Sequence, residues 1–300
     1  MKRFLFLAMW PGVAAAQDVP EIVVTGRGLA DAPGDRAFDI VTLERDRILS
    51  SASGRVEDVL RDVAGLQQFR RSDLRSANPT SQGITLRGLG GNASSRALLL
   101  LDGVPQADPF GGWVAFPAYA TDRLGRVRVT RGGGSGVAGP GALAGTIELD
   151  SATPADLAPL SGSLAYGSRA SVDARATAAL TRSGGFATLS GAYARGDGFL
   201  PIVAEDRGPA DRAAPFEQAS AAARAVLQVA AATELQANVS AFTDRRDRGL
   251  DFTDNRSEGR MPASGSSGVG RSAGRCSAIS RPAPLPADSP ASGQGARRPR

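Results

Sequence analysis

The chain has 300 residues and a formal net charge of +5. It contains no histidine, a single cysteine (Cys276) and a single lysine (Lys2). These counts exclude a histidine-activated nucleophile, an intrachain disulfide, a thiolate zinc cluster and a P-loop or Schiff-base lysine. We therefore expect that the protein is not an enzyme and has neither a metal site nor a cofactor.

Residues 1–16 are arranged like a secretory signal peptide. Lys2 and Arg3 give a positive start, residues 4–10 form a short apolar run, and alanines at 14–16 offer a cleavage site. The run is too short to span a membrane. Export would leave a mature chain that starts near Gln17, with residues 17–35 as an extended segment that holds one strand-like apolar patch.

Residues 36–152 have the pattern of a compact α+β domain. Four apolar residues follow helical spacing, namely Val56, Val59, Leu60 and Val63. Ser53 is placed to cap the start of this helix, and Gly65 is placed to end it in a left-handed turn. We interpret the charged residues nearby as a solvated helix face; these are the acidic residues at 57, 58 and 62 and the arginines at 61, 70, 71 and 75.

Several strands are predicted in the same domain. Residues 84–87, 97–101 and 146–149 are predicted to be strands, and Val127 and Val129 alternate with Arg126, Arg128 and Thr130 as in a half-exposed strand. Asp102 and Gly103 follow the second strand and predict a tight hairpin turn.

Residues 134–139 match the dinucleotide-binding pattern G-x-G-x-x-G. That site needs a helix that opens at the third glycine. Here Pro140 and Gly141 follow at once, and a strand follows them. We therefore expect a close-packed backbone corner rather than a nucleotide site.

Residues 158–258 change to a period-two pattern. About five strands alternate apolar and polar residues, and several are longer than the usual 5–6 residues of globular strands. Long polar loops are expected at about 196–216 and 245–258, and the other connections are tight. This combination is typical of transmembrane β-barrel strands with short periplasmic turns and longer external loops. A soluble β-sandwich is the alternative.

Residues 259–300 lose this alternation. They hold seven arginines and one acidic residue among many glycines, prolines and serines. We expect this tail to be disordered, and a frame change near residue 259 would explain it. Most of the basic excess lies in this tail and the signal peptide, so the charge does not indicate nucleic-acid binding.

Four motifs in order give the chain a family resemblance. They are residues 21–26 (EIVVTG), residues 59–66 (VLRDVAGL), the pair 84–88 (ITLRG) and 100–105 (LLDGVP), and residues 123–147 with their arginines and glycines. With these motifs the chain resembles TonB-dependent receptors, the plugged outer-membrane transporters of Gram-negative bacteria, over roughly residues 1–258. It departs from the family pattern at Ala138, usually an aromatic residue, and at Ala144, usually a glycine.

The resemblance assigns roles to particular residues. It implies a TonB box at Glu21, Ile22, Val23, Val24, Thr25 and Gly26, which would bind the periplasmic protein TonB by strand addition. It implies a plug domain at 36–152 whose structural motif residues are Arg87, Gly88, Asp102, Gly103, Arg131, Gly132, Gly139 and Gly145.

The resemblance also implies a function and a location. The protein would lie in the outer membrane, in contact with lipid, and take up a scarce ligand with energy from TonB. An iron–siderophore is the commonest ligand of the family, and cobalamin, other metals or sugars stay open. The family barrel has about 22 strands, so we expect the five strands alone not to transport. The alternative is a soluble periplasmic binding or signalling module built on a small β-sandwich.

Overall fold

The structure is a computed structural model that describes residues 38–69, 75, 82–89, 94–108, 110–132, 138–230, 233–251 and 253–268. The predicted signal peptide, the predicted TonB box and residues 269–300 lie outside the described residues.

A five-stranded mixed sheet forms the centre of the N-terminal domain, residues 38–152. Its strands are β1 (Asp39–Glu44), β4 (Ala97–Leu101), β5 (Val104–Pro105), β6 (Leu124–Arg131) and β7 (Gly145–Ser151). They lie in the order β1-β6-β7-β4-β5, with β4 and β7 parallel and the other pairs antiparallel. On β6, Val127 and Val129 are buried while Arg126 and Arg128, which alternate with them, are partly exposed, which confirms the predicted half-exposed strand.

Short helices and a two-stranded sheet surround the core of this domain. They are α1 (Arg45–Leu49), α2 (Val56–Val59), the 3₁₀ helices η2 (Leu60–Asp62), η3 (Phe116–Ala118), η4 (Thr121–Arg123) and η5 (Pro140–Ala142), and the pair β2 (Leu66–Gln68) and β3 (Ile84–Leu86). No helix among the described residues is long and apolar enough to span a membrane.

The predicted helix face exists, but the helix is shorter than its spacing indicated. All four apolar residues of that face are buried in the core. α2 tightens into η2 after one turn, and Val63 is already extended. Arg55, not Ser53, occupies the N-cap position, and the Ser53 hydroxyl accepts a hydrogen bond from the Arg55 backbone N–H at 3.3 Å. The prediction that Ser53 caps the helix was therefore wrong.

Left-handed backbone positions end several elements. Gly65 has φ +79°, as predicted for the stop after the helix. Arg87 has φ +58°, so β3 ends at Leu86, one residue earlier than predicted. Asp102 and Gly103 have φ +49° and +81° and join β4 to β5 as a two-residue loop. Two central residues with positive φ are the signature of the type I′ hairpin turn, which confirms the predicted turn.

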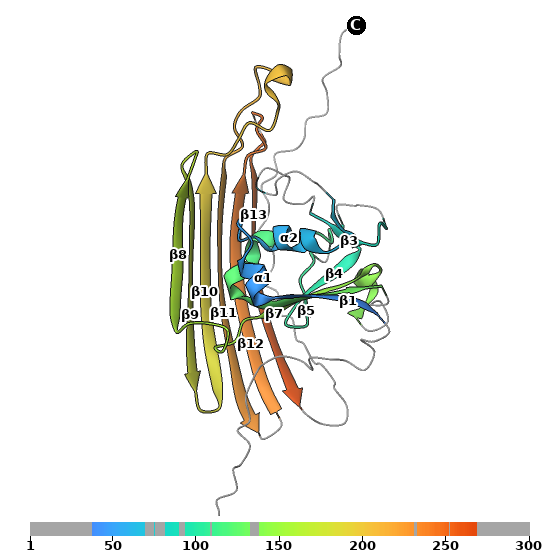
Figure 1. Ribbon diagram of the computed structural model, residues 1–300, viewed down its shortest axis with the longest axis vertical. Helices are drawn as coiled ribbons and strands as arrows, with labels where there is room; N and C mark the ends of the chain where they lie inside the picture. The colour runs from blue at the N-terminus through green and yellow to red at the C-terminus, as the bar shows by residue number, and fades with distance from the viewer. Residues whose placement is uncertain are drawn as a thin grey trace, which may run out of the picture.

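The later strands form a six-stranded antiparallel sheet, here called the wall sheet. Its strands are β8 (Leu160–Gly167), β9 (Ser171–Arg182), β10 (Gly185–Gly196), β11 (Phe216–Ala230), β12 (Thr233–Arg246) and β13 (Asn255–Gly268). Each strand pairs with its neighbours in the chain, and within the described residues the edge strands β8 and β13 do not close the sheet. Figure 1 shows the long strands side by side, with the N-terminal domain packed on one side of the sheet.

The connections of the wall sheet differ at its two ends. At one end, here called the turn end, two residues join β9 to β10 and two join β11 to β12. At the other end, here called the loop end, residues 197–215 join β10 to β11 and residues 247–254 join β12 to β13. The long connections therefore share one end of the sheet, as predicted.

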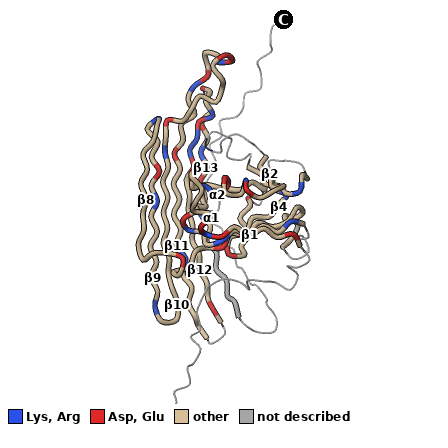
Figure 2. The backbone as a smooth tube through the Cα atoms, viewed as in Figure 1, with Lys and Arg blue, Asp and Glu red and all other residues tan. Residues whose placement is uncertain are grey.

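The two faces of the wall sheet have opposite polarity. The outer face, away from the N-terminal domain, carries large apolar side chains that are 43% to 78% exposed, namely Leu160, Leu164, Tyr166, Leu180, Leu189, Leu227, Val229, Leu235 and Val239. The inner face carries buried polar residues, namely Thr177, Arg224, Asn238, Ser240, Asp244 and Arg246. Figure 2 shows few charged residues along the long strands. A β-sandwich buries its apolar faces between two sheets, and no second sheet covers the outer face within the described residues.

The sixth strand corrects two boundaries expected from the sequence. β13 begins at Asn255, inside the expected second loop, and continues to Gly268, inside the expected disordered tail. It pairs with the whole length of β12, from Arg246↔Asn255 to Thr233↔Gly268. The alternation was not visible because the exposed row of β13 begins with Arg256, Glu258 and Arg260 rather than with apolar residues. β13 is therefore recognised by its backbone hydrogen bonds to β12 and not by an alternation of apolar and polar side chains.

Candidate functional site

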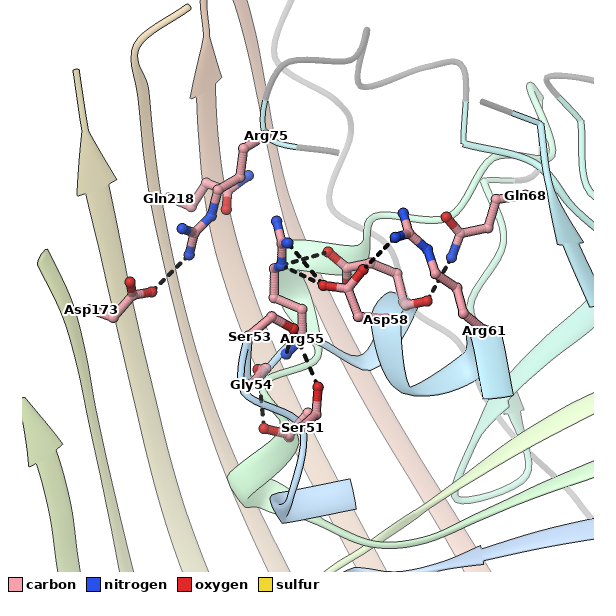
Figure 3. A network of polar contacts seen from close by, with 12 residues as sticks. Ser51, Ser53, Gly54, Arg55, Asp58, Arg61, Gln68, Arg75, Asp173 and Gln218 are labelled. Atoms are coloured by element: carbon pink, nitrogen blue, oxygen red, sulfur yellow. Dashed lines mark hydrogen bonds and ion pairs between the residues drawn. The ribbon is translucent and has the colours of Figure 1, made fainter. Parts of the chain in front are cut away.

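Polar contacts join the N-terminal domain to the inner face of the wall sheet, and one of them lies near the loop end. Arg75, from the connection between β2 and β3, donates a hydrogen bond to Asp173 Oδ1 on β9 at 2.7 Å (Figure 3). Its guanidinium carbon also lies 4.3 Å from the ring centre of Phe216 on β11. A charge-assisted hydrogen bond and a cation–π contact stabilise the same side chain. Arg75 thus binds two wall strands at once.

A second contact lies at the Ser53–Gly54 corner that precedes α2. Arg175 on β9 donates to the Ser53 carbonyl at 3.2 Å. Gly54 has φ +58°, and a Cβ atom there would lie 1.8 Å from Arg175 Nη1. The Thr121 hydroxyl fixes the same corner by donating to the Gly54 carbonyl at 3.1 Å. Glycine therefore gives the wall arginine close access to the domain backbone.

A third contact lies at the loop end of β12, where Arg246 and Asp244 form a buried ion pair at 2.6 Å. Gln82 of the N-terminal domain faces this pair. In the amide orientation that satisfies both its ends, Gln82 donates to the Val114 carbonyl at 3.0 Å and accepts from Arg246 at 2.7 and 3.1 Å. Gln218 on β11 donates to Asp244 Oδ1 at 3.0 Å. The buried charges are therefore held by hydrogen bonds from both sides of the boundary.

A fourth contact involves Asp102 at the hairpin turn between β4 and β5. Its carboxylate accepts hydrogen bonds from the Ser151 N–H at 2.9 Å and the Ser151 hydroxyl at 2.7 Å. Across the boundary, Oδ2 lies 3.4 Å from Arg224 Nε on β11 and accepts from Asn238 Nδ2 on β12 at 3.4 Å. The Asp102 and Arg224 side chains are 6% and 3% exposed. This is a nearly dry ion pair between the domain and the wall.

Ionisable groups around α2 range from the buried Glu57 to the half-exposed Arg61. Arg55 and Arg61 both form ion pairs with Asp58, and Gln68 donates to the Glu57 carbonyl (Figure 3). Burial raises the pKa of the Glu57 carboxyl, and the Arg55 guanidinium opposes part of that rise. The charge cluster is therefore more than the solvated helix face expected from the sequence, because Glu57 is buried.

Similar shifts occur around η4. Burial raises the pKa of the Asp122 carboxyl, against the opposing charge of Arg175. Burial also lowers the pKa of the Arg123 guanidinium and raises the pKa of the Tyr119 hydroxyl. Each shift disfavours the charged form because water is excluded from this part of the boundary.

Apolar packing and a small cavity complete the boundary. Phe242 on β12 belongs to the same buried cluster as Phe116 of η3, and Met261 on β13 packs against that cluster. Nearby lies a cavity of about 20 Å³ whose lining includes Arg123, Ser151, Arg224 and Asn238. A polar cavity of this size has room for about one water molecule.

The predicted structural residues lie within the N-terminal domain. Arg131 on β6 pairs with Asp39 on β1. Gly132 and Gly139 have φ +80° and +97°. Gly145 has φ +136°, and a Cβ atom there would lie 2.0 Å from the Thr130 carbonyl oxygen. The predicted TonB box lies outside the described residues, so its role stays a prediction.

Sequence reasoning did not single out the wall residues Asp173, Arg175, Arg224 and Asn238. They are the polar residues of alternating strands, and that pattern predicts a polar sheet face but no particular contact. Asp102 was expected to form a turn and does so, but its link to the wall was not foreseen. After Gly139 comes the three-residue helix η5 and then β7, so no α-helix opens there as a dinucleotide site needs.

Comparison with known families identifies the N-terminal domain. Residues 34–146 match the family model described as the TonB-dependent receptor plug domain. The chain carries a TonB-dependent receptor plug domain. Arg87, Gly88, Asp102, Gly103, Arg131, Gly132, Gly139 and Gly145 all lie inside the matched range. A sequence search of curated proteins finds no match.

Solved structures share the fold of the plug domain and the wall sheet. The ferric enterobactin receptor PfeA of Pseudomonas aeruginosa has 15% identity and a TM-score of 0.56, over 79% of this chain and 38% of that receptor. The siderophore receptor PirA of Acinetobacter baumannii has 14% identity and a TM-score of 0.56, over 76% and 37% of the two chains. The copper transporter OprC has 19% identity and a TM-score of 0.55, over 76% and 34%.

These matches confirm the family resemblance and the fold class. The chain pairs a mixed α/β plug domain with an open antiparallel sheet, and its matched part spans less than half the length of each of these receptors. TonB-dependent receptors are outer-membrane transport proteins rather than enzymes. Within the described residues, no group of three or more histidine, cysteine or acidic residues is arranged to hold a metal ion.

Proposed function

We propose that this protein acts in TonB-dependent uptake across the outer membrane, with the plug domain resting against a lipid-facing wall. The observation that carries this proposal is the inverted polarity of the wall sheet. Its inner face buries charged residues against the plug domain, and its outer face exposes large apolar side chains. A membrane strand alternates in this way, apolar toward lipid and polar toward the lumen.

The outer row of β11 supports contact with hydrocarbon. It is apolar from Ala219 to Val229, at every second residue. A tilted strand needs about 9–11 residues to cross the hydrocarbon core. Tyr166 and Tyr193 lie on the outer face toward the loop end, where barrels place interfacial aromatic residues. The loop end would then face outward, and the predicted signal peptide would direct export to this membrane.

The ligand class proposed is an iron–siderophore. The support is that PfeA and PirA, which share this fold, are described as ferric enterobactin and siderophore receptors. OprC is described as a copper transporter, so the fold also serves another metal. Cobalamin and sugars are further ligands to test by direct binding.

The energy-coupling partner proposed is TonB, bound at residues 21–26. Three consecutive β-branched residues there, Ile22, Val23 and Val24, favour an extended strand. Main-chain hydrogen bonds from such a strand would add it to the edge of a partner's sheet. Thr25 and Gly26 end the patch before the polar linker.

Replacing Val23 with proline tests this partner. Proline removes a backbone N–H and its hydrogen bond to a neighbouring strand. We expect Val23→Pro to weaken binding of the 300-residue chain to the periplasmic domain of TonB by about tenfold or more. Calorimetry with both purified proteins measures the change.

The matched control is Leu29→Pro, in the same segment but outside the box, and it should bind as the wild type does. Equal TonB affinity for the wild type and Val23→Pro would contradict the proposed box. In a complete receptor, Val23→Pro should abolish uptake and leave ligand binding unchanged.

A further inference from the structure

The Asp102 carboxylate does more than its turn requires. A type I′ turn needs two residues that accept positive φ, and asparagine or glycine serves there as well as aspartate. In this chain both carboxylate oxygens are used, Oδ1 by the Ser151 N–H and Oδ2 by the Ser151 hydroxyl, Arg224 and Asn238. Two of these partners belong to the wall sheet. The charge at the hairpin tip therefore has a role beyond the turn.

The wall supplies one cation at this level of its inner face. In the strand register, Arg224 on β11 lies opposite Thr188 on β10 and Asn238 on β12, and Thr188 lies opposite Ala179 on β9. None of these neighbours in the row is charged. The Arg224 guanidinium also lies 5.3 Å from the ring centre of Phe186. Buried Arg123 also acts electrostatically on Asp102, but it belongs to the plug domain itself, so Arg224 carries the attraction to the wall. Because the Asp102 and Arg224 side chains are almost fully buried, little water is present to replace a lost partner across the boundary.

The Asp102–Arg224 pair lies near the turn end of the wall sheet, beside the connection that joins the plug domain to the wall. Of the four polar contacts described above, it lies closest to the turn end, because Arg224 and Asn238 follow the rows of Asp173 and Arg175 toward the tight turns. Ser151 ends β7, and the connection to wall strand β8 follows directly. Asp102 thus joins the hairpin, the last plug strand and the wall at one point.

A small cavity lies beside the Arg224 and Asn238 side of this contact. Arg224, Asn238 and Ser151 all line this cavity of about 20 Å³, together with Thr177, Thr188 and Ser190. If the carboxylate moves away, one water molecule can reach the groups that it leaves. A completely dry site would lack that replacement.

We propose that Asp102 and Arg224 form a latch that holds the plug domain on wall strands β11 and β12. Resting on the uptake function proposed above, the latch must open before the plug domain can move relative to the wall. Asp102 and Arg224 are positioning residues in this proposal, and neither contacts the ligand.

The latch can be tested in the 300-residue chain held in detergent micelles. A specific protease site is placed in the connection at residues 153–158, and the chain is folded and then cut. The measurement is the rate at which the plug fragment dissociates from the wall fragment. Asp102→Asn keeps the left-handed turn and an oxygen for Ser151 but removes the charge. Arg224→Gln removes the partner and leaves the plug sequence unchanged.

We expect each variant to release the plug fragment about tenfold faster or more, because truncating one partner of a buried charge pair acts mainly on dissociation. The double variant should be no faster than the faster single variant, because both changes break one contact. The matched control is Asp150→Asn on β7, which loses a 2.8 Å pair with Arg126 inside the plug domain. It should release at the wild-type rate.

Release of Asp102→Asn at the rate of Asp150→Asn would overturn the latch, and so would single effects that multiply in the double variant. Hydrogen exchange in β4 and β5 checks that Asp102→Asn is folded. If Asp102→Asn is not folded, the test rests on Arg224→Gln alone. Release of the plug fragment from that variant at the wild-type rate would then overturn the proposal. The assay contains neither TonB nor ligand, so its result is separate from the test of the uptake function.

Discussion

Glu57 is a carboxylate that the fold removes from water. It lies on α2, its side chain is 7% exposed, and the nearest arginine atom that pairs with it, Arg55 Nε, is 3.9 Å away. Burial raises the pKa of its carboxyl, so the folded domain holds the proton more tightly than the unfolded chain does. Its contribution to stability is complete below the unfolded pKa and is lost as the pH rises through the higher folded pKa.

Glu57→Gln should therefore change how stability depends on pH. We expect the wild type to lose thermal stability relative to Glu57→Gln between about pH 4 and pH 8, with the gap in Tm changing by about 4 °C or more. Thermal unfolding of both proteins at the two pH values measures this. Asp122 also has a raised pKa, but it is present in both proteins, so its effect on Tm is absent from the difference between them. The same Tm gap at both pH values would show that Glu57 does not titrate with folding.

At the scale of elements, the pairing of β6 with β7 depends on a glycine. In the β6–β7 strand pair, Gly145 is the first residue of β7 and lies opposite Arg131 of β6. Gly145 has φ +136°, and a Cβ atom would lie 2.0 Å from the Thr130 carbonyl oxygen. Backbone, unlike the end of a flexible side chain, cannot move aside without disturbing the strand pair. Glycine is required at position 145 both by the positive φ angle and by the lack of room for a Cβ atom.

Gly145→Ala should lower the free energy of unfolding of the plug domain by about 2 kcal/mol or more. Urea unfolding of the 300-residue chain in micelles measures the change. Gly191→Ala is the matched control, because the nearest atom to a Cβ there is the Ser220 oxygen at an ordinary 3.9 Å. Equal destabilisation by both substitutions would contradict the strained contact at Gly145.

The elements also show what could be predicted from the sequence. Period-two alternation identified β8 to β12, since their outer rows are mainly apolar and their inner rows mainly polar. β13 was missed because Arg256, Glu258 and Arg260 break that pattern and only pairing with β12 defines the strand. The partners of Asp102 could not be predicted, because Arg224 and Asn238 lie far along the chain and an Asp-Gly pair indicates only a turn.

At the scale of the whole molecule, the plug domain and the wall sheet form one continuous arrangement. Phe242 and Met261 of the wall pack with the buried core of the plug domain, and four polar contacts surround this packing. The exposed apolar face lies on the opposite side of the same strands. A single open sheet thus holds the plug domain on one face, by polar and apolar contacts, and exposes apolar side chains on the other.

Collision measurements with spin labels along β12 test this arrangement most directly. Single cysteines replace Leu235 and Val239 on the outer face, Gln236 and Ser240 on the inner face, and Val203 in the long loop as a water-exposed reference, in a Cys276→Ser chain reconstituted in lipid vesicles. We expect labels at 235 and 239 to collide with lipid-soluble oxygen and not with a water-soluble nickel complex, and labels at 236 and 240 to be shielded from both. Labels at 235 and 239 as accessible to the nickel complex as the label at 203 would contradict a lipid-facing wall.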